Sequence, residues 1–561
     1  MLKKSLLSSA LSGPASSSQQ SEEPKADYEL NPYQPRGGKE VVPSSLKDPS
    51  RNFLTEAVIG SLPKALSLSE RQSISASTPL SPTLNLLSSL PSDKVHARSL
   101  EGRRLRRHVL RGAVLVFITA GYSGKRFIFE KAKELGVRSV IVDGPESWSQ
   151  TLVEEGIVER FIGLDMSDAE TVFDRCLEAI KKVKKEFGEL DGVLSFSEMA
   201  MPLVARLTEQ LGLPGNTPAA VDAARDKHAT REHMAAAGLP TPRNYLITSA
   251  DQLKAASDHV RYPAVIKPIY GAASIGVVRV DDYQHLQESY AKVTKELASA
   301  KIVAGALQQG DDEDGDGAAA ADAKGNASSW IKTTIMMEEY LDGPEVDVDL
   351  VFSGGQPVYG AVTDNWPTVE PYFNETGSNS PSILPTYQQR ELLDLAVKSV
   401  QALGFVTGVF HVECKYTSRG ARLIEVNCRM GGGPVRNMNL LVWGVDLVEE
   451  QLLCTAGIPS RPPVAAKPLM NIAEFSVNAM KTGILRDAHF LDKYQNDPDV
   501  LYARPIVQPG SKVVSVEDGL PTWVCELMVT KPTIDEAIQY IKKMEEEIQA
   551  TMPIDALPKK H

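Results

Sequence analysis

Apolar runs and helix-spaced apolar positions alternate through the first strongly patterned part of the chain. Short apolar runs that predict buried strands lie at 113–120, 139–144 and 192–196. Between them, residues 127–135 and 168–186 place apolar side chains at helical spacing. Strands that alternate with helices predict a parallel α/β unit with right-handed connections, which we expect to extend to residue 221.

A different pattern begins at residue 222, where strand signals become more frequent. A glycine-rich turn, GAASIG at 271–276, follows the strand PAVIKP. The turn Ser418-Arg419-Gly420 separates two apolar runs and predicts an antiparallel hairpin. The expected strands are 263–268, 277–280, 335–341, 346–352, 407–414 and 422–428. A helix is expected at 436–456 and a charged helix at 534–549.

Composition narrows the class of protein. The 561 residues are 42% hydrophobic and 24% charged, and the formal charge is −12. Such an acidic chain is a poor candidate for nucleic-acid binding, and no apolar run approaches the roughly 20 residues that span a bilayer. We therefore expect neither nucleic acid nor a membrane as partner. The five cysteines form no CxxC pair, which favours a reducing compartment; they are Cys176, Cys414, Cys428, Cys454 and Cys525.

Two segments have the composition of disordered chain. Residues 1–108 are rich in Ser, Pro and charge and are expected to form a largely disordered tail, with local order left open at 53–68 and 84–90. Its closing cluster Arg103-Arg104-Leu105-Arg106-Arg107 is expected to be solvated, with contact to an acidic partner as the alternative. Residues 305–329 are acidic and Gly/Ala-rich and are expected to be a disordered insertion. A cytoplasmic location is expected, and organelle targeting by the tail stays open.

The turn Gly121-Tyr-Ser-Gly-Lys125 resembles a P-loop but lacks its spacing. Thr119 stands where the first glycine of GxxxxGK would be, and Arg126 replaces the final Ser or Thr. A strand-to-helix turn eased by glycine is the better interpretation. Contact with a small molecule stays open, because ligands favour the carboxyl ends of parallel strands.

The predicted hairpin carries the strongest candidate chemistry. Glu425 and Asn427 lie two apart on one strand, so they share a face, and the short turn can bring Glu413 opposite them. Two carboxylates and an amide oxygen suit a hard cation such as Mg²⁺, with nucleotide phosphates completing its coordination. Arg429 follows directly and adds a guanidinium next to this set.

A second group of residues suits phosphate binding. Lys267 ends an apolar strand four residues before the glycine-rich turn, and a lysine beside such a turn is a common way to hold phosphates. Glu338 ends another strand, and Glu345 follows soon after. Each signal is weak alone; their order along the chain is specific.

Together these motifs resemble the ATP-grasp superfamily of carboxylate–amine ligases. The matching pieces are ARDKHATREHMAAAGLPTP, AVIKPIYGAASIGV, MEEYLDGPEVDVD and HVECKYTSRGARLIEVNCRMGGG. The stretch from MEEYLDGPEVDVD to RMGGG and WGVDL is most similar to the carnosine synthase group and to bacterial L-amino-acid ligases.

The resemblance implies an α/β and α+β chain, with an ATP-grasp fold preceded by a Rossmann-like parallel α/β domain. The implied divisions are the tail 1–108, a Rossmann-like domain 109–221, a lid subdomain 222–345 containing the insertion 305–329, a metal-binding subdomain 346–470 and a small α+β domain 471–561.

The resemblance also implies roles for individual residues. ATP would be held by Lys227, Lys267, Ser274 and Gly276 at the phosphates, Glu338, Tyr340 and Leu341 at adenine, and Glu345 at ribose. One or two Mg²⁺ (or Mn²⁺) ions would be bound by Glu413, Glu425 and Asn427, and Arg429 and Lys267 would act in catalysis. Substrate would meet Glu375, Ser378, Arg429, Gly432 and Arg436. Ser378 stands where many dipeptide-forming members have His, so their substrate preference cannot be copied.

The implied activity is ATP-dependent amide formation between two amino acids through an acyl-phosphate, with a carnosine-type product (β-alanine and histidine) as the leading expectation. Small amino acids are the expected partners, and a homodimer is expected by analogy alone. Two alternatives stay open: a ligase acting on a carboxylate that is not an amino acid, and a nucleotide-binding regulatory protein without catalysis.

Overall fold

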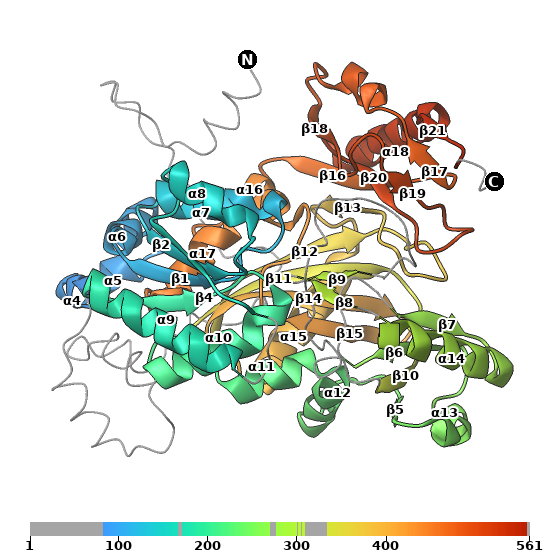
Figure 1. The fold of residues 1–561 in the computed structure, drawn as a ribbon, viewed down its shortest axis with the longest axis horizontal. Coiled ribbons are helices and arrows are strands. Elements are labelled where there is room, and N and C mark those ends of the chain that lie inside the picture. The colour runs from blue at the N-terminus through green and yellow to red at the C-terminus, as the bar shows by residue number, and fades with distance from the viewer. Residues whose placement is uncertain are drawn as a thin grey trace.

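The computed structural model describes residues 82–166, 171–269, 276–299, 301–303, 306–308 and 334–557. Three regions lie around a large central sheet: the N-terminal part on one side, a small sheet on another and the C-terminal part above (Figure 1). Within the described residues, no helix combines the length and the apolar character needed to cross a membrane.

The N-terminal region is a parallel sheet covered on both faces. Its strand order is β3-β2-β1-β4, and every pairing is parallel, as predicted. Leu115 and Phe117 of β1 pack toward α7, while Val114 and Val116 pack toward α9 and α10. The elements are β1 (Val114–Ile118), α7 (Arg126–Glu134), β2 (Arg138–Asp143), α8 (Thr151–Glu154), β3 (Arg160–Gly163), α9 (Val172–Phe187), β4 (Gly192–Leu194) and α10 (Met201–Leu211).

Three helices precede this sheet where a tail was expected. They are α4 (Pro82–Ser89), α5 (Ser92–Val95) and α6 (Leu100–Leu110), and Leu87, Val109 and Leu110 are buried in the core. The prediction of disorder is therefore wrong for residues 82–108, because apolar side chains there pack onto the folded region. Of the two stretches where local order was left open, 84–90 is ordered in α4, and 53–68 lies outside the described residues with the rest of 1–81.

A four-stranded sheet of order β5-β10-β6-β7 forms one wall of the candidate site. Strands β8 and β9 pair with each other, so residues 306–308 of the expected insertion are strand; the rest of 305–329 lies outside the described residues. The elements are α11 (Pro218–Arg225), α12 (Lys227–Ala236), β5 (Asn244–Ile247), α13 (Leu253–Val260), β6 (Ala264–Pro268), β7 (Val278–Val280), α14 (Tyr283–Ser299), β8 (Lys301–Val303), β9 (Ala306–Gln308) and β10 (Ile335–Glu339).

The large sheet is antiparallel, with the order β15-β14-β11-β12-β13-β16-β20-β18. The predicted hairpin is its β14–β15 edge. The expected helix 436–456 is two helices, divided at Gly444, whose positive φ of 76° ends α16. The elements are β11 (Glu345–Ser353), β12 (Gln356–Asn365), β13 (Gly377–Ser380), α15 (Thr386–Ala402), β14 (Gly408–Thr417), β15 (Gly420–Asn427), α16 (Val435–Trp443) and α17 (Leu447–Thr455).

The C-terminal region extends this sheet. Strand β16 pairs with β13 and carries β20 and β18 beyond it, and α18 packs on β16 and β20. The elements are β16 (Asn471–Asn478), β17 (Gly483–Leu485), β18 (Val500–Pro505), β19 (Lys512–Val513), β20 (Trp523–Lys531), α18 (Ile534–Thr551) and β21 (Ile554–Asp555).

Candidate active site

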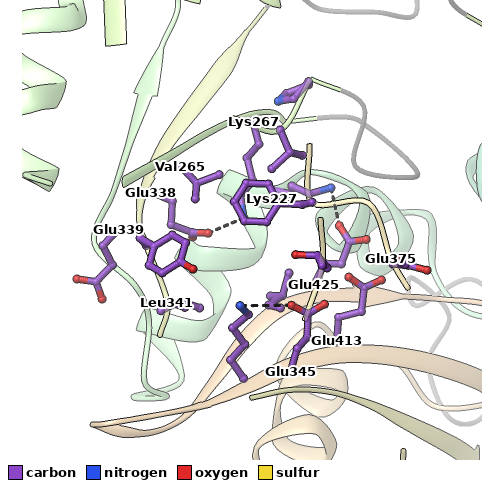
Figure 2. A pocket seen from close by; sticks show the side chains of 17 residues that line it. Lys227, Val265, Lys267, Glu338, Glu339, Leu341, Glu345, Glu375, Glu413 and Glu425 are labelled. Atoms are coloured by element: carbon purple, nitrogen blue, oxygen red, sulfur yellow. Dashed lines mark hydrogen bonds and ion pairs between the residues drawn. The ribbon is translucent and has the colours of Figure 1, made fainter. Parts of the chain in front are cut away.

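A cavity lies between the β5-β10-β6-β7 sheet and the hairpin edge of the large sheet (Figure 2). It encloses about 1000 Å³ of empty space, part of it open to solvent, which is ample for a nucleotide. Val265, Thr368 and Phe373 add apolar and neutral lining. Nine of the predicted site residues line it: Lys227, Lys267, Glu338, Tyr340, Leu341, Glu345, Glu375, Glu413 and Glu425.

The two predicted phosphate-binding lysines come from different elements. Lys227 begins α12, whose N-cap is Asp226, and its Nζ lies 2.5 Å from Oε2 of Glu425. Lys267 lies in β6, and its Nζ lies 2.5 Å from Oε2 of Glu338. Burial lowers the pKa of Lys267 despite this pair, whereas Glu425 raises the pKa of Lys227 against its own burial. Both lysines bring positive charge to the cavity, and each is already balanced by a carboxylate.

Glu338 is the buried counter-ion of two cations. Its carboxylate lies 2.5 Å from Arg231 Nε and 2.5 Å from Lys267 Nζ, and the residue is 3% exposed. Burial favours the protonated acid, but Arg231 and Lys267 outweigh it and lower the pKa of Glu338 to about 2. Its predicted contact with adenine stays a prediction. Arg231 was missed, although it lies four residues after Lys227 and thus on the same face of α12.

The hairpin places the predicted metal ligands together. Glu413 stands directly opposite Glu425 across the β14–β15 pair, and His411 stands opposite Asn427. Burial and the facing charge of Glu425 raise the pKa of Glu413 well above its usual range. Asn427 Nδ2 donates to Glu413 at 3.1 Å and lies 3.4 Å from Glu425. These are two crowded carboxylates, of which Glu425 is paired with Lys227, and they are a donor set that fits a divalent ion.

The side-chain amide of Asn427 is turned so that its nitrogen, not its oxygen, faces the carboxylates. Its amide presents Nδ2 to the carboxylates, while its Oδ1 accepts from Arg429 at 3.3 Å. A metal ion needs the oxygen, so the amide would have to turn over when one is bound. In the described part of the chain, no group of three or more His, Cys, Asp or Glu side chains is arranged to hold a metal. The candidate set is accordingly two carboxylates and one amide.

Two aspartates of β11 lie beside this hairpin and were missed. Asp347 is in register with Glu413, and Asp349 with His411. His411 Nδ1 lies 2.8 Å from Asp349 Oδ1, and the two aspartates outweigh burial and raise the pKa of His411 to about 10. His411 is therefore a buried cation paired with Asp349. The alternation Val-Asp-Val-Asp at 346–349 was the available signal, since it places both aspartates on one face.

Tyr340 and Leu341, predicted for adenine, follow β10 on one side of the cavity, whereas Glu345, predicted for ribose, lies beside Glu413 and Glu425 of the hairpin (Figure 2). Strand β10 ends at Glu339, directly before Tyr340 and Leu341. The Tyr340 ring lies 4.6 Å from the Arg279 guanidinium, measured from ring centroid to Cζ. Glu345 lies 3.5 Å from Lys415, and burial raises its pKa.

Glu375 lines the cavity, whereas Ser378, three residues later, contacts Glu474 of the C-terminal region. Figure 2 shows Glu375 on the same side of the cavity as Glu413 and Glu425. Burial, followed by the charges of Asp347 and Glu345, raises the pKa of Glu375 to about 7. Ser378 is buried, and its Oγ donates to Glu474 at 3.3 Å. Ser378 is therefore not among the residues that line the cavity.

The remaining predicted residues follow the hairpin or belong to the glycine-rich turn. Arg429 Nε lies 3.0 Å from Glu198, so the N-terminal region reaches this arginine. Arg436 forms a bidentate pair with Asp446 at 2.9 and 2.7 Å, away from the cavity. Gly432 has open space where a Cβ would lie, and Gly276 has a positive φ of 75°. Ser274 lies outside the described residues.

Comparisons with known proteins agree with this arrangement. Three family descriptions match in succession: "ATP-grasp N-terminal domain" at 129–215, "RimK-like ATP-grasp domain" at 224–309 and "ATP-grasp domain" at 317–437. The solved structure of an L-amino acid ligase from Bacillus licheniformis superposes with a TM-score of 0.63 at 21% identity, covering 78% of this chain and 98% of that one. The chain therefore has the ATP-grasp fold and belongs to the ATP-grasp superfamily.

Two curated relatives show which members of that superfamily the sequence is similar to. Carnosine synthase 1 of Homo sapiens is 31% identical over 375 residues, which is 65% of this chain and 42% of the relative. Alanine–anticapsin ligase of Bacillus subtilis (strain 168) is 26% identical over 277 residues, 49% of this chain and 56% of that enzyme. The chain thus spans about two fifths of the length of the carnosine synthases it matches.

Proposed function

We propose that this protein is an ATP-dependent, ADP-forming ligase that joins two amino acids by an amide bond, with a carnosine-type dipeptide as the leading product. The observation that carries the proposal is the convergence of Lys227, Lys267 and the Glu413–Glu425 pair on one cavity. The similarity to carnosine synthase and alanine–anticapsin ligase supports amino acids as the substrates.

The chemistry explains why the cavity needs these residue types. A substrate carboxylate attacks the γ-phosphorus of ATP and ADP leaves; the amine then attacks the acyl carbon, phosphate leaves, and the nitrogen loses a proton. Phosphoryl transfer depends mainly on positioning and neutralisation of charge, which cationic side chains provide. Lys227 and Lys267 supply that charge at the cavity, and Arg429 supplies it beside the hairpin.

Glu413, Glu425 and Asn427 would hold Mg²⁺ or Mn²⁺ on the hairpin side. A bound divalent ion would neutralise phosphate charge and fix the orientation of the triphosphate. The chain's own contribution is to keep two carboxylates facing each other on a rigid hairpin, where burial strengthens their attraction for a cation.

The test is a screen of purified protein with ATP, Mg²⁺ and amino acids, singly and in pairs, with ADP release and product mass as readouts. We expect turnover that needs two amino acids, with a product mass equal to their sum minus water. Glu425→Gln should reduce turnover by on the order of 10²–10³, the usual effect of losing one preorganised charged group. Glu232→Gln, on the exposed face of α12, is the matched control and should retain activity.

Turnover only with another class of carboxylic acid would replace the dipeptide with a different amide. ATP binding without turnover on any acid would favour the regulatory alternative and refute a ligase.

A further inference from the structure

The turn Gly121–Lys125, which resembled a P-loop, lies at the edge of the N-terminal sheet that faces the hairpin. Strands β1 and β4 are parallel neighbours, so their carboxyl ends meet at one edge. Lys125 follows β1, while Phe196 and Glu198 follow β4. Trp148 Nε1 donates to the Gly121 carbonyl at 2.6 Å and anchors the turn.

Lys125 is a half-buried cation that points to this junction. Its Nζ donates to the Phe196 carbonyl at 2.6 Å, and no carboxylate of the described residues lies within 4.0 Å of it. Burial and the nearby Arg429 lower the pKa of Lys125 to about 8, while Glu198 acts in the opposite direction. The lysine is therefore still largely protonated near neutral pH. Glu198 forms its ion pair with Arg429, so among the described residues the hydrogen-bond partner of Lys125 is the Phe196 carbonyl and not a carboxylate.

The other cations around the site are already paired. Lys227 is bound by Glu425, and Lys267 by Glu338. Arg436, predicted to meet the carboxylate of the amine substrate, donates through Nε and Nη2 to Asp446 and stacks on Phe127 with 5.0 Å between Cζ and the ring centroid. The role predicted for Arg436 therefore needs another side chain.

We propose that Lys125, together with Arg429, binds the free carboxylate of the amine-donating amino acid. The proposal rests on the ligase function above. In amide formation, one carboxylate is activated at the γ-phosphate, and the carboxylate of the amine donor passes through the reaction unchanged. That second carboxylate needs a cation outside the nucleotide cavity. Lys125 does not line the cavity, yet it lies beside Arg429, which follows the metal hairpin directly.

The test combines a variant with a change in the substrate. For an amino-acid pair that the wild-type protein joins, KM is measured for the amine donor and for its primary carboxamide, which lacks the negative charge. Lys125→Gln should raise the KM for the free acid by about 10- to 100-fold, the factor expected for losing a hydrogen bond to a charged group. The KM for the carboxamide, for ATP and for the activated acid should stay unchanged.

Two further variants separate charge from folding. Lys125→Arg should restore most of the affinity for the free acid, because the charge returns. Lys133→Gln, at an exposed lysine of α7, should behave as wild type. An equal effect of Lys125→Gln on acid and carboxamide, or a rise in KM for ATP, would overturn the proposal.

Thermal stabilisation by ligand gives a readout without turnover. A ligand that binds only the folded protein raises its melting temperature, and at one ligand concentration the rise is larger for tighter binding. Amino acids should stabilise the wild-type protein more than their carboxamides do, and Lys125→Gln should remove that difference. If no pair is turned over but the difference is present, the ligase function fails while a carboxylate site at Lys125 survives. If pairs are turned over and Lys125→Gln changes neither readout, this proposal alone is refuted.

Discussion

The two sides of the nucleotide cavity balance charge in opposite ways. On the β6–β10 side, Glu338 is enclosed by two cations, Arg231 and Lys267, and its pKa falls to about 2. On the hairpin side, Glu413 faces Glu425, and its pKa rises well above the usual range. The first side is complete within the folded chain. On the second side, Lys227 pairs with Glu425, whereas Glu413 has no ion-pair partner among the described residues and would be free to accept a cation from solution.

The strongest test of this contrast is Glu338→Gln. Removing the carboxylate leaves Arg231 and Lys267 buried without their counter-ion, and breaking such a network typically costs about 3–5 kcal/mol. We expect a loss of that order in the free energy of unfolding, measured by urea denaturation. Glu288→Gln, on an exposed position of α14, should leave stability within about 0.5 kcal/mol of wild type.

The pH dependence of this loss has a definite sign. The folded-state pKa of Glu338, about 2, lies below the ordinary value of 4.5, so its ionised form contributes stability above pH 4.5 and loses it as the pH falls toward 2. The difference between wild type and Glu338→Gln should be full at neutral pH and narrow in acid. A deficit that stays constant down to pH 3 would contradict the ion-pair explanation.

Glu413→Gln should produce the opposite combination of effects. Its removal relieves repulsion with Glu425, so the melting temperature should be unchanged or higher, while ADP release should fall by on the order of 10²–10³. Glu425→Gln should lose similar activity but also stability, because Lys227 then loses its partner at 2.5 Å. Equal losses of stability in the two variants would contradict the view that Glu425 is stabilised by an ion pair while Glu413 is repelled by its neighbour.

The hairpin could be predicted because its chemistry is local in sequence. Glu425 and Asn427 share a face by strand periodicity, and a two-residue turn fixes the register that brings Glu413 opposite them. The parallel α/β unit of the N-terminal region could be predicted equally well. Its strands β1 and β2 are buried on both faces, so their sequences are nearly continuous apolar runs.

Partners distant in sequence could not be predicted. Arg231 meets Glu338 across 107 positions, and nothing in either local sequence marks the pair. The neighbours of Lys125 could not be predicted either, because Phe196 and Arg429 lie in segments far from Lys125 along the sequence. The ion pair of Arg436 with Asp446 could not be predicted either, because Asp446 follows a helix break that the pattern did not reveal.

The helices at 82–110 show how composition alone misleads. Their charge and serine content are typical of a tail, yet Arg103 and Arg107 both bind the buried Glu449 of α17. Arg106 is 1% exposed and donates to the carbonyls of Val95, Ala97 and Arg461. The expectation of a solvated arginine cluster is therefore wrong for these three residues, because carboxylates and carbonyls far along the chain satisfy them.

The smallest expected effect tests whether this N-terminal segment is part of the cooperative fold. Burial, with Arg461 and Arg106, lowers the pKa of His96 to about 4, below the ordinary 6.5. The unfolded chain then binds a proton at His96 between pH 6.5 and 4 while the folded chain does not, so stability falls across that window as the pH drops. His96→Gln should remove a pH-dependent loss on the order of 1 kcal/mol in the free energy of unfolding, after allowance for partial exposure.

The readout for His96→Gln is the melting temperature at pH 7.5 and pH 5, with His489→Gln, at an exposed histidine, as control. Parallel profiles for wild type and His96→Gln would mean that these helices unfold separately from the ATP-grasp core.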